Sequence, residues 1–473
     1  MGFISAVRDI GRHRIEEAEF YRDLDLRLLQ LPLMPSFDSD RGQDAILVGL
    51  KMEDPLDSVL HIEGVDKVEL RAYWTEGLTF DEQKRRYCFK EPAGSNVTWG
   101  FSPVYRLGRP KKNSVKDLLG SNGRLARLRR TVLDDYERSG VFSEGSVDLI
   151  IEELTNRAEE LADLWSDSKR DYILVFGVFH GGRFLYPGDV PAFVHYYKNK
   201  IKSQIYDSSF PGFCSVCHTH SEQCVNLDQV FAFATFDKPG FLPGTRGTAN
   251  ARSKVFPICL ACFSELNLGR EHLDTHFCDR RTIWGINIYV APELLFDLRS
   301  PMSLNDTFRD FIRVGLRREE SLFRSLARRD EALVYHFVFW EAQQAQERIH
   351  LMVEDVPPSH LKQLERVWTE TARVFELEDE RKTLDYALGE VVRVIRSFAG
   401  ESEQDQKAMQ MYAISVIGKL LNNEPVDVKT IKTLAVSRLP GLVHDDKWLD
   451  YGSANAQRLA AIVDFLNRCA RRG

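Results

Sequence analysis

The spacing of apolar and polar residues predicts β-strands in the first two thirds of the chain. Residues 68–74 alternate between apolar and polar, which is typical of a half-buried strand, whereas residues 172–179 form an unbroken apolar run, typical of a strand covered on both faces. Further strands are expected at 45–48, 59–62, 230–236, 286–290 and 334–340. Amphipathic helices are expected at 4–22, 146–168 and, after Asp189 as N-cap, as far as Tyr206.

Helical periodicity dominates from about residue 304 onward. After Pro357-Pro358, with Ser359 as the expected N-cap, apolar residues recur at helical spacing to the end of the chain and predict a helical bundle. Since 473 residues exceed one usual hydrophobic core, we expect three domains: 1–170 with α+β structure and a basic loop, 171–350 with α/β structure, and 351–473 as the bundle.

Two cysteine pairs are the clearest chemical signal. Cys214 and Cys217 are separated by two residues, as are Cys259 and Cys262, and this spacing lets two thiolates of one turn reach a common tetrahedral ion. Four sulfurs close the shell and leave no position for water, so the pattern indicates a structural Zn²⁺ ion. The alternative is four buried free cysteines. Other possible ligands near the pairs are His218, His220, Cys224, His272, His276 and Cys278.

With this site, the predicted fold class is α+β: an N-terminal mixed α/β region with an inserted four-cysteine zinc site, followed by a C-terminal helical bundle. No apolar run approaches the length of a membrane-spanning helix, and residues 1–14 lack the apolar segment of a secretory signal. Eight cysteines in such a chain favour metal ligands or free thiols in a reducing compartment, so we expect a cytoplasmic protein.

Positive charge is concentrated between Lys84 and Arg130. This window holds thirteen basic residues against two acidic ones, although the whole chain carries a net charge of −7. Interleaved aromatic residues suit contact with phosphates and bases. The expected phosphate contacts are Arg106, Arg109, Lys111 and Lys112, with Arg252 and Lys254 in second rank, and the expected base readers are Asn96 and Asn113. The alternative is a solvated basic face offset by the acidic helix that follows.

Catalytic patterns are missing from the sequence. No phosphate-cradling glycine loop and no Gly-x-Ser-x-Gly elbow is present, and His444-Asp445 stands without further histidines. We therefore expect a protein that is not an enzyme.

Several stretches resemble one family, the large subunit of type I-B CRISPR interference complexes (Cascade). The resemblance rests on 186–193 after a buried strand, on the two cysteine pairs, on 237–240, on Lys254 and the residues leading to Cys259, on Gly269, and on 350–361. These stretches cover roughly residues 170 to 365. The regions on either side match in character more than in motif.

The resemblance implies a non-catalytic subunit that binds guide RNA and double-stranded target DNA. It implies recognition of the protospacer-adjacent motif, promotion of unwinding and R-loop formation, assembly with backbone subunits and a small subunit, and recruitment of a helicase-nuclease. The family's zinc ligands correspond to Cys214, Cys217, Cys259 and Cys262. Its bundle resembles the separate small subunit, and translation from Met352 is a hypothesis that would yield 122 residues.

Two other functions are compatible with the residues. One is a zinc-stabilised nucleic-acid-binding scaffold of a repair or RNA-processing system, which would need no guide RNA. The other is a zinc-dependent hydrolase that uses His218, His220 or His272 together with the cysteines, with fewer than four sulfurs on the metal.

Overall fold

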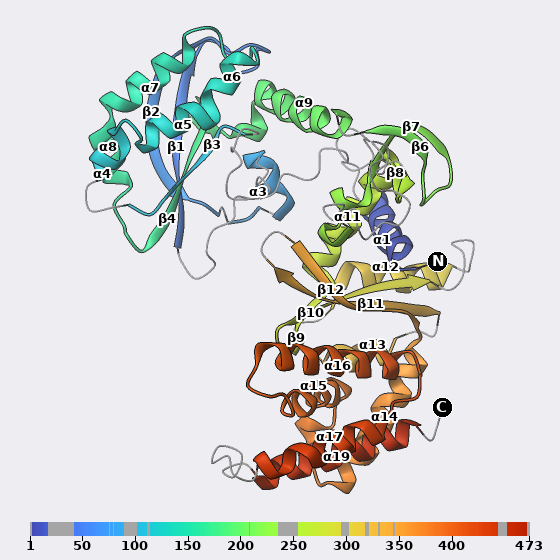
Figure 1. The fold of residues 1–473 in the computed structure, drawn as a ribbon. Helices are drawn as coiled ribbons and strands as arrows, with labels where there is room; N and C mark the ends of the chain where they lie inside the picture. Colours follow the sequence, from blue (N-terminus) through green and yellow to red (C-terminus); the bar gives the residue numbers. More distant parts are fainter. Residues whose placement is uncertain are drawn as a thin grey trace. The chain divides into compact units, whose positions relative to one another are not determined.

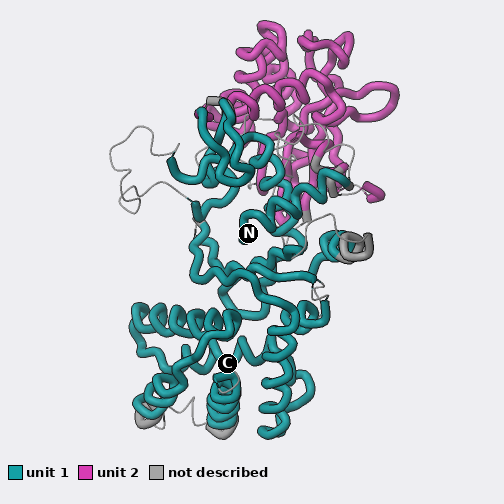
Figure 2. Tube along the Cα trace, turned by 90° about the vertical axis from the view of Figure 1, so that its right-hand side faces the viewer, with its two compact units in different colours: residues 1–22, 211–473 teal, residues 23–210 magenta. Residues whose placement is uncertain are grey.

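The chain forms two compact units, residues 1–22 with 211–473, and residues 23–210 (Figure 2). The computed structural model describes residues 2–17, 42–74, 76–78, 80–88, 102–110, 114–207, 209–234, 254–294, 302–316, 321–329, 332–343, 346–442 and 452–470. In the described residues no helix is both long and apolar enough to cross a membrane. The predicted division after residue 170 falls within the 23–210 unit, and the predicted division after residue 350 falls within the other unit.

A mixed sheet forms the centre of the 23–210 unit. Its strand order is β2-β1-β4-β3, and β5 pairs with one end of β4. β1 and β4 are parallel, and the other pairs are antiparallel. Because β4 lies beside β1, the strand that follows residue 170 belongs with the N-terminal sheet. The strands are β1 (Gly42–Met52), β2 (Ile62–Ala72), β3 (Val104–Gly108), β4 (Arg170–His180) and β5 (Arg183–Leu185).

The pleat of this sheet divides its apolar residues between two cores. On β4, Leu174 and Phe176 point into the core beneath the helices, whereas Ile173 and Val175 belong to a second core on the opposite face. All four side chains are fully buried. The prediction of a strand covered on both faces at 172–179 is confirmed.

Helices of the 23–210 unit differ from the predicted ones in their bounds. The acidic segment 146–168 forms two helices, because the chain leaves helical geometry at Arg157, whose guanidinium donates to the Val65 carbonyl at 3.0 Å. The predicted cap at Asp189 is wrong, since its carboxylate accepts a hydrogen bond from Tyr186 N and the helix begins at Pro191. The helices are α3 (Phe80–Tyr87), α4 (Ser114–Leu119), α5 (Arg124–Leu128), α6 (Asp134–Arg138), α7 (Ser146–Asn156), α8 (Ala158–Leu164) and α9 (Pro191–Asp207).

An antiparallel sheet of order β12-β11-β10-β9 forms the centre of the other unit. In Figure 1, α1, α11 and α12 lie on one side of it, and α13 with the C-terminal helices lies on the other. The strands predicted at 286–290 and 334–340 are confirmed as parts of β10 and β11. The elements are α1 (Phe3–Glu17), α11 (Leu260–His276), β9 (Cys278–Ile283), β10 (Ile286–Leu294), α12 (Met302–Val314), α13 (Leu322–Ala327), β11 (Leu333–Gln343) and β12 (Gln346–Val356).

The strand predicted at 230–236 is wrong over its described part, because residues 232–234 form a 3-10 turn. Phe231, just before this turn, is fully buried and packs its ring against Phe3 of α1 at a centroid distance of 5.7 Å. Phe231 therefore owes its burial to packing beside α1 and not to a place in a strand.

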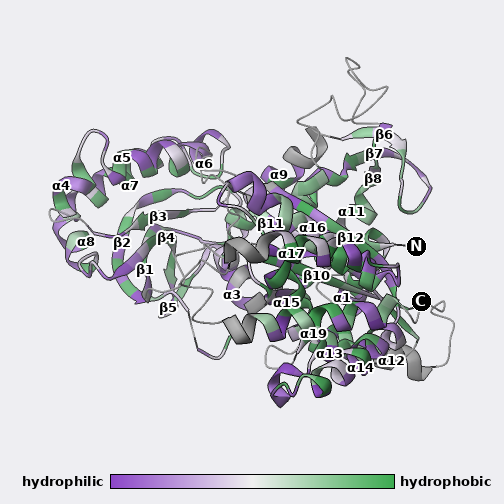
Figure 3. Cartoon of the chain, turned by 60° about the horizontal axis from the view of Figure 1, so that its bottom comes forward, coloured by the Kyte–Doolittle hydropathy of each residue, from purple (hydrophilic) through white to green (hydrophobic). Residues whose placement is uncertain are grey.

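Among the described residues after β12, five helices complete this unit, and the helices in Figure 3 carry both hydrophilic and hydrophobic stretches. The first and last meet where Trp368 packs edge-on against Phe465 at 5.4 Å. Pro357, and not the predicted Ser359, is the N-cap of the first helix. The C-terminal helices begin at Pro358 and not at residue 351, the predicted start of the bundle, because residues 346–356 form β12. They are α14 (Pro358–Val374), α15 (Leu384–Arg396), α16 (Glu403–Leu421), α17 (Val428–Leu442) and α19 (Gly452–Ala470).

Candidate metal centre

A small three-stranded sheet brings the two cysteine pairs to the same place. Cys214 follows β6 (Phe210–Phe213), and Cys217 lies in the turn that leads to β7 (His220–Asn226). Cys259 is the last residue of β8 (Pro257–Cys259), and Cys262 lies in the first turn of α11. Because β7 pairs with both β6 and β8, the first cysteine pair comes to lie beside the second across the long insert.

The turn from Cys214 to Thr219 is closed by its own backbone. Cys214 N donates to the Thr219 carbonyl at 2.9 Å, and His218 N donates to the Cys214 carbonyl at 2.9 Å. His218 adopts a positive φ of 59°, which lets the chain reverse. Within the turn, the backbone N–H groups of Val216 and Cys217 point at Cys214 Sγ, at 3.4 and 3.5 Å. Such donors favour the thiolate form of the sulfur.

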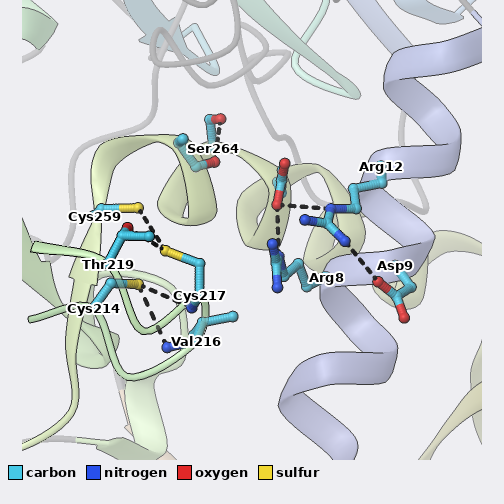
Figure 4. Close-up of polar contacts among 11 residues, drawn as sticks. Arg8, Asp9, Arg12, Cys214, Val216, Cys217, Thr219, Cys259 and Ser264 are labelled. Carbon is cyan, nitrogen blue, oxygen red and sulfur yellow. Dashed lines mark hydrogen bonds and ion pairs between the residues drawn. The ribbon is translucent and has the colours of Figure 1, made fainter.

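The four sulfur atoms fit a tetrahedral metal ion. All of them lie within 4.8 Å of one another, and Cys217 Sγ and Cys259 Sγ are 3.7 Å apart. Two sulfurs of a tetrahedral Zn²⁺ site are about 3.8 Å apart, given Zn–S bonds of about 2.3 Å. Figure 4 shows the Cys214, Cys217 and Cys259 side chains turned toward a common point. Three of the four residues are buried and Cys217 is half-buried, so a bound ion would be shielded from water.

Proton sharing couples the thiols of this group. Hydrogen bonds from Cys259 and Cys262 lower the pKa of Cys214 well below that of an ordinary thiol. The same contact with Cys214 raises the pKa of Cys259 to about 11 and the pKa of Cys262 further still. A sulfur of this group that keeps its proton can donate it to a neighbouring ionised sulfur. A metal ion that binds all four thiolates must displace the remaining protons, so its affinity falls as the pH is lowered.

The N-terminus of α11 contributes to the electrostatics of the site. Cys259 is its N-cap residue, in extended geometry, and Cys262 occupies the first turn. The positive end of the helix dipole thus lies at the sulfur group and favours anionic thiolates.

Helix α1, which lies about 250 residues before α11 in the sequence, packs against α11 and holds it in position. Arg8 Nε and Arg12 Nε both approach Glu265 Oε2 of α11, at 2.7 and 3.2 Å (Figure 4). The backbones meet at two glycines: a Cβ on Gly11 would lie 1.8 Å from the Glu265 carbonyl oxygen, and a Cβ on Gly269 would lie 1.9 Å from that of Val7. This close crossing explains why residues 1–22 belong to the same unit as the cysteines.

Histidines that the sequence offered as ligands have other partners. His220 packs edge-on against Phe213, and His272 Nε2 shares a hydrogen bond with the Ile312 carbonyl at 2.8 Å. Burial lowers the pKa of His272 to about 3, so this imidazole is neutral. Cys224 Sγ lies near the Gly212 carbonyl at 3.5 Å. In the described part of the chain, the sulfur group includes no histidine.

The predicted nucleic-acid contacts are only partly described. Arg106 is a half-buried residue of β3, opposite Ile173. Arg109 is nearly half exposed and lies 3.8 Å from the buried carboxylate of Asp171, so part of its role is to neutralise that group. Lys254 is exposed shortly before β8. Asn96, Lys111, Lys112, Asn113 and Arg252 lie outside the described residues. Their roles stay predictions.

A second group of potential ligands was missed by sequence reasoning. The ligand atoms of Glu293, His336 and Asp355 lie within 4.8 Å of one another on β10, β11 and β12. His336 Nε2 and Glu293 Oε2 are 2.6 Å apart, and His336 Nδ1 accepts from Asp355 N at 3.4 Å. Both ring nitrogens are therefore satisfied within the sheet, as in a structural histidine. No spacing rule predicts this group, because its members come from three separate strands.

The region of the chain that contains the four cysteines is similar to a known protein family. Residues 211–356 match the family model for the central domain of CRISPR-associated protein TM1802. The matched range includes all four cysteines, α11 and the four-stranded sheet, and the residues before 211 and after 356 lie outside it. No curated protein matches the chain. The similarity of this central region supports a CRISPR-associated protein.

Proposed function

We propose that the chain is the large subunit of a type I-B CRISPR RNA-guided surveillance complex. The observation that carries this proposal is the match of residues 211–356 to a CRISPR-associated central domain, which coincides with the cysteine pairs and with most of the resembling stretches. In this role the protein binds guide RNA, backbone subunits and a small subunit, recognises the protospacer-adjacent motif on duplex DNA, and helps recruit the helicase-nuclease.

The metal in this proposal is Zn²⁺ with a structural role. Sulfur-only ligation selects a soft or borderline ion, and the sulfur spacing suits a tetrahedral one. Cys214, Cys217, Cys259 and Cys262 would hold it and thereby fix β8 and the start of α11 to the turn after β6. A closed shell of four sulfurs supports a subunit without a catalytic metal, since no ligand position is left for water.

Copurification tests the proposal. The tagged chain is purified from cells that also express the backbone subunits of a type I-B system and a CRISPR array, and the bound RNA is sized on a gel. We expect backbone subunits and one guide RNA of defined length. Binding without guide RNA or subunits would favour the repair or RNA-processing scaffold, and chelator-sensitive hydrolysis would favour the hydrolase.

Binding of target DNA by the assembled complex tests whether Lys111 and Lys112, in the basic window between Lys84 and Arg130, contact phosphates. Replacement of Lys111 and Lys112 by alanine should weaken binding to duplexes with the motif and lower the slope of log K against log salt by about two, since each phosphate contact contributes about 0.9. The matched control replaces Lys51 and Arg183, two exposed basic residues of the same unit, and should leave the slope unchanged. Equal slopes for the wild-type chain, the Lys111 and Lys112 variant and the control would contradict the assignment of Lys111 and Lys112 as phosphate contacts.

A further inference from the structure

Trp284 is an exposed tryptophan at the tip of a hairpin. It forms, with Gly285, the two-residue turn between β9 and β10, because Ile283 pairs with Ile286 across the hairpin. The side chain is 81% exposed, the highest value among the exposed large apolar residues that the structure describes. A tryptophan in this position adds little to the core, so its exposed ring needs another explanation.

The hairpin is fixed on the C-terminal helices. Thr282 Oγ1 donates to Asp385 Oδ1 of α15 at 3.3 Å. A Cβ on Gly389 would lie 3.3 Å from the Thr282 carbonyl oxygen, so a small residue on α15 permits this close approach. The Arg396 guanidinium lies over the Trp284 ring at 5.5 Å from its centroid, which adds a cation–π contact. The ring is therefore held in a defined place beside α15.

A cavity of about 620 Å³ opens beside this ring. Its cationic lining residues are Arg281 of β9 and Arg393 and Arg396 of α15, and none of the described residues that line it is acidic. Arg393 Nη1 contacts Glu390 Oε1 at 2.6 Å, but Glu390 is buried beneath the surface, whereas the Arg393 side chain is 63% exposed. The mouth of the cavity is therefore positively charged and has an aromatic wall.

From this arrangement we infer a binding site for single-stranded nucleic acid, in which a base stacks on Trp284 and Arg281, Arg393 and Arg396 contact the neighbouring phosphates. An aromatic ring beside a cationic groove is the combination that binds unpaired strands with little sequence preference. A duplex offers no free base face for such stacking. The inference deepens the proposed function, on which it rests, by naming residues that would hold an unpaired strand of guide RNA or DNA.

Fluorescence anisotropy of the full-length chain with labelled dT15 and rU15 tests the site. We expect Trp284→Ala to raise the Kd about 5- to 150-fold, the range that corresponds to the loss of one base–aromatic stack. Trp284→Phe should retain much of the affinity, because a smaller ring still stacks. Arg393→Ala with Arg396→Ala should weaken binding and reduce its salt dependence.

Matched controls separate the site from general effects of charge or aromatic loss. Trp74→Ala removes another exposed tryptophan, and Arg366→Ala with Arg373→Ala removes two exposed charges from α14. Both should bind like the wild-type chain. A larger loss with rU15 would identify the guide RNA as the ligand, and a larger loss with dT15 would identify the displaced DNA strand; either result supports the site.

The inference is wrong if Trp284→Ala and the double arginine variant bind both oligonucleotides as the wild-type chain does. It is also wrong if Trp284→Ala abolishes copurification of a protein subunit while oligonucleotide binding is unchanged, because the ring would then contact protein. Guide-RNA copurification by the wild-type chain tests the proposed function separately, so failure of the one is distinguishable from failure of the other.

Discussion

At the scale of single residues, the cysteine spacing predicted that Cys214, Cys217, Cys259 and Cys262 lie close together, and the structure brings their sulfur atoms within 4.8 Å of one another. The spacing could not show that the four cysteines lie in different kinds of secondary structure. Cys217 and Cys214 lie in a turn, whereas Cys262 is part of a long helix and Cys259 precedes it. Loss of Cys262 would thus remove the ligand through which a bound ion is tied to α11.

We expect Cys262→Ser to lower bound zinc from about one ion per chain to nearly none, because structural zinc sites use all four ligands. The melting temperature of the metal-loaded protein should fall accordingly. Metal content by mass spectrometry and a thermal melt measure both effects. Cys278→Ser, which changes a cysteine outside the sulfur group, is the control. A full zinc content in Cys262→Ser would contradict four-sulfur ligation.

Elements with a clear apolar period were predictable, and those shaped by long-range packing were not. β4, β10 and β11 follow from their apolar runs, and the C-terminal helices follow from helical periodicity. Beside the turn at 232–234, Phe231 contacts Phe3, and at the helix break Arg157 contacts Val65. No local pattern contains these long-range contacts. The site inferred at Trp284 likewise joins a hairpin to a helix about one hundred residues later, although the arginine pair Arg280-Arg281 shortly before Trp284-Gly285 was a usable hint.

The crossing of α1 and α11 gives a prediction at this scale. Gly269→Ala would place a methyl group against the Val7 carbonyl, so the helices must separate or tilt. We expect a loss of about 1–3 kcal/mol or more in the free energy of unfolding, as for other overpacked contacts. Chemical denaturation of the metal-loaded protein measures it. Ser5→Ala, a half-buried position on α1, should change stability little. Equal stabilities of Gly269→Ala and the wild-type chain would show that the crossing tolerates a side chain.

At the scale of the whole molecule, the hypothesis of a second product from Met352 meets a specific structural context. Met352 lies in the middle of β12, opposite Val338, and the helices begin only at Pro358. A chain that starts at Met352 would lack the rest of the sheet. It would keep the contact between Trp368 and Phe465 that joins the first and last helices.

We therefore expect any 122-residue product to fold as a helical bundle. A C-terminal tag and an immunoblot would show whether it is made, and Met352→Leu should remove the short band while the full-length band stays. Persistence of the band in Met352→Leu would place its origin elsewhere, for example in proteolysis. Circular dichroism of the isolated product checks its helicity.

The glycine crossing near the metal centre also has a consequence for synthesis. Gly11 leaves the ribosome long before its partner Gly269, and the whole 23–210 unit is translated between them. At about 5–20 residues per second, α1 waits roughly 10–50 s for α11. During that interval the intervening unit has its complete sheet and can fold first. The unit that holds the four cysteines is therefore completed last, after all residues of the 23–210 unit have been synthesised.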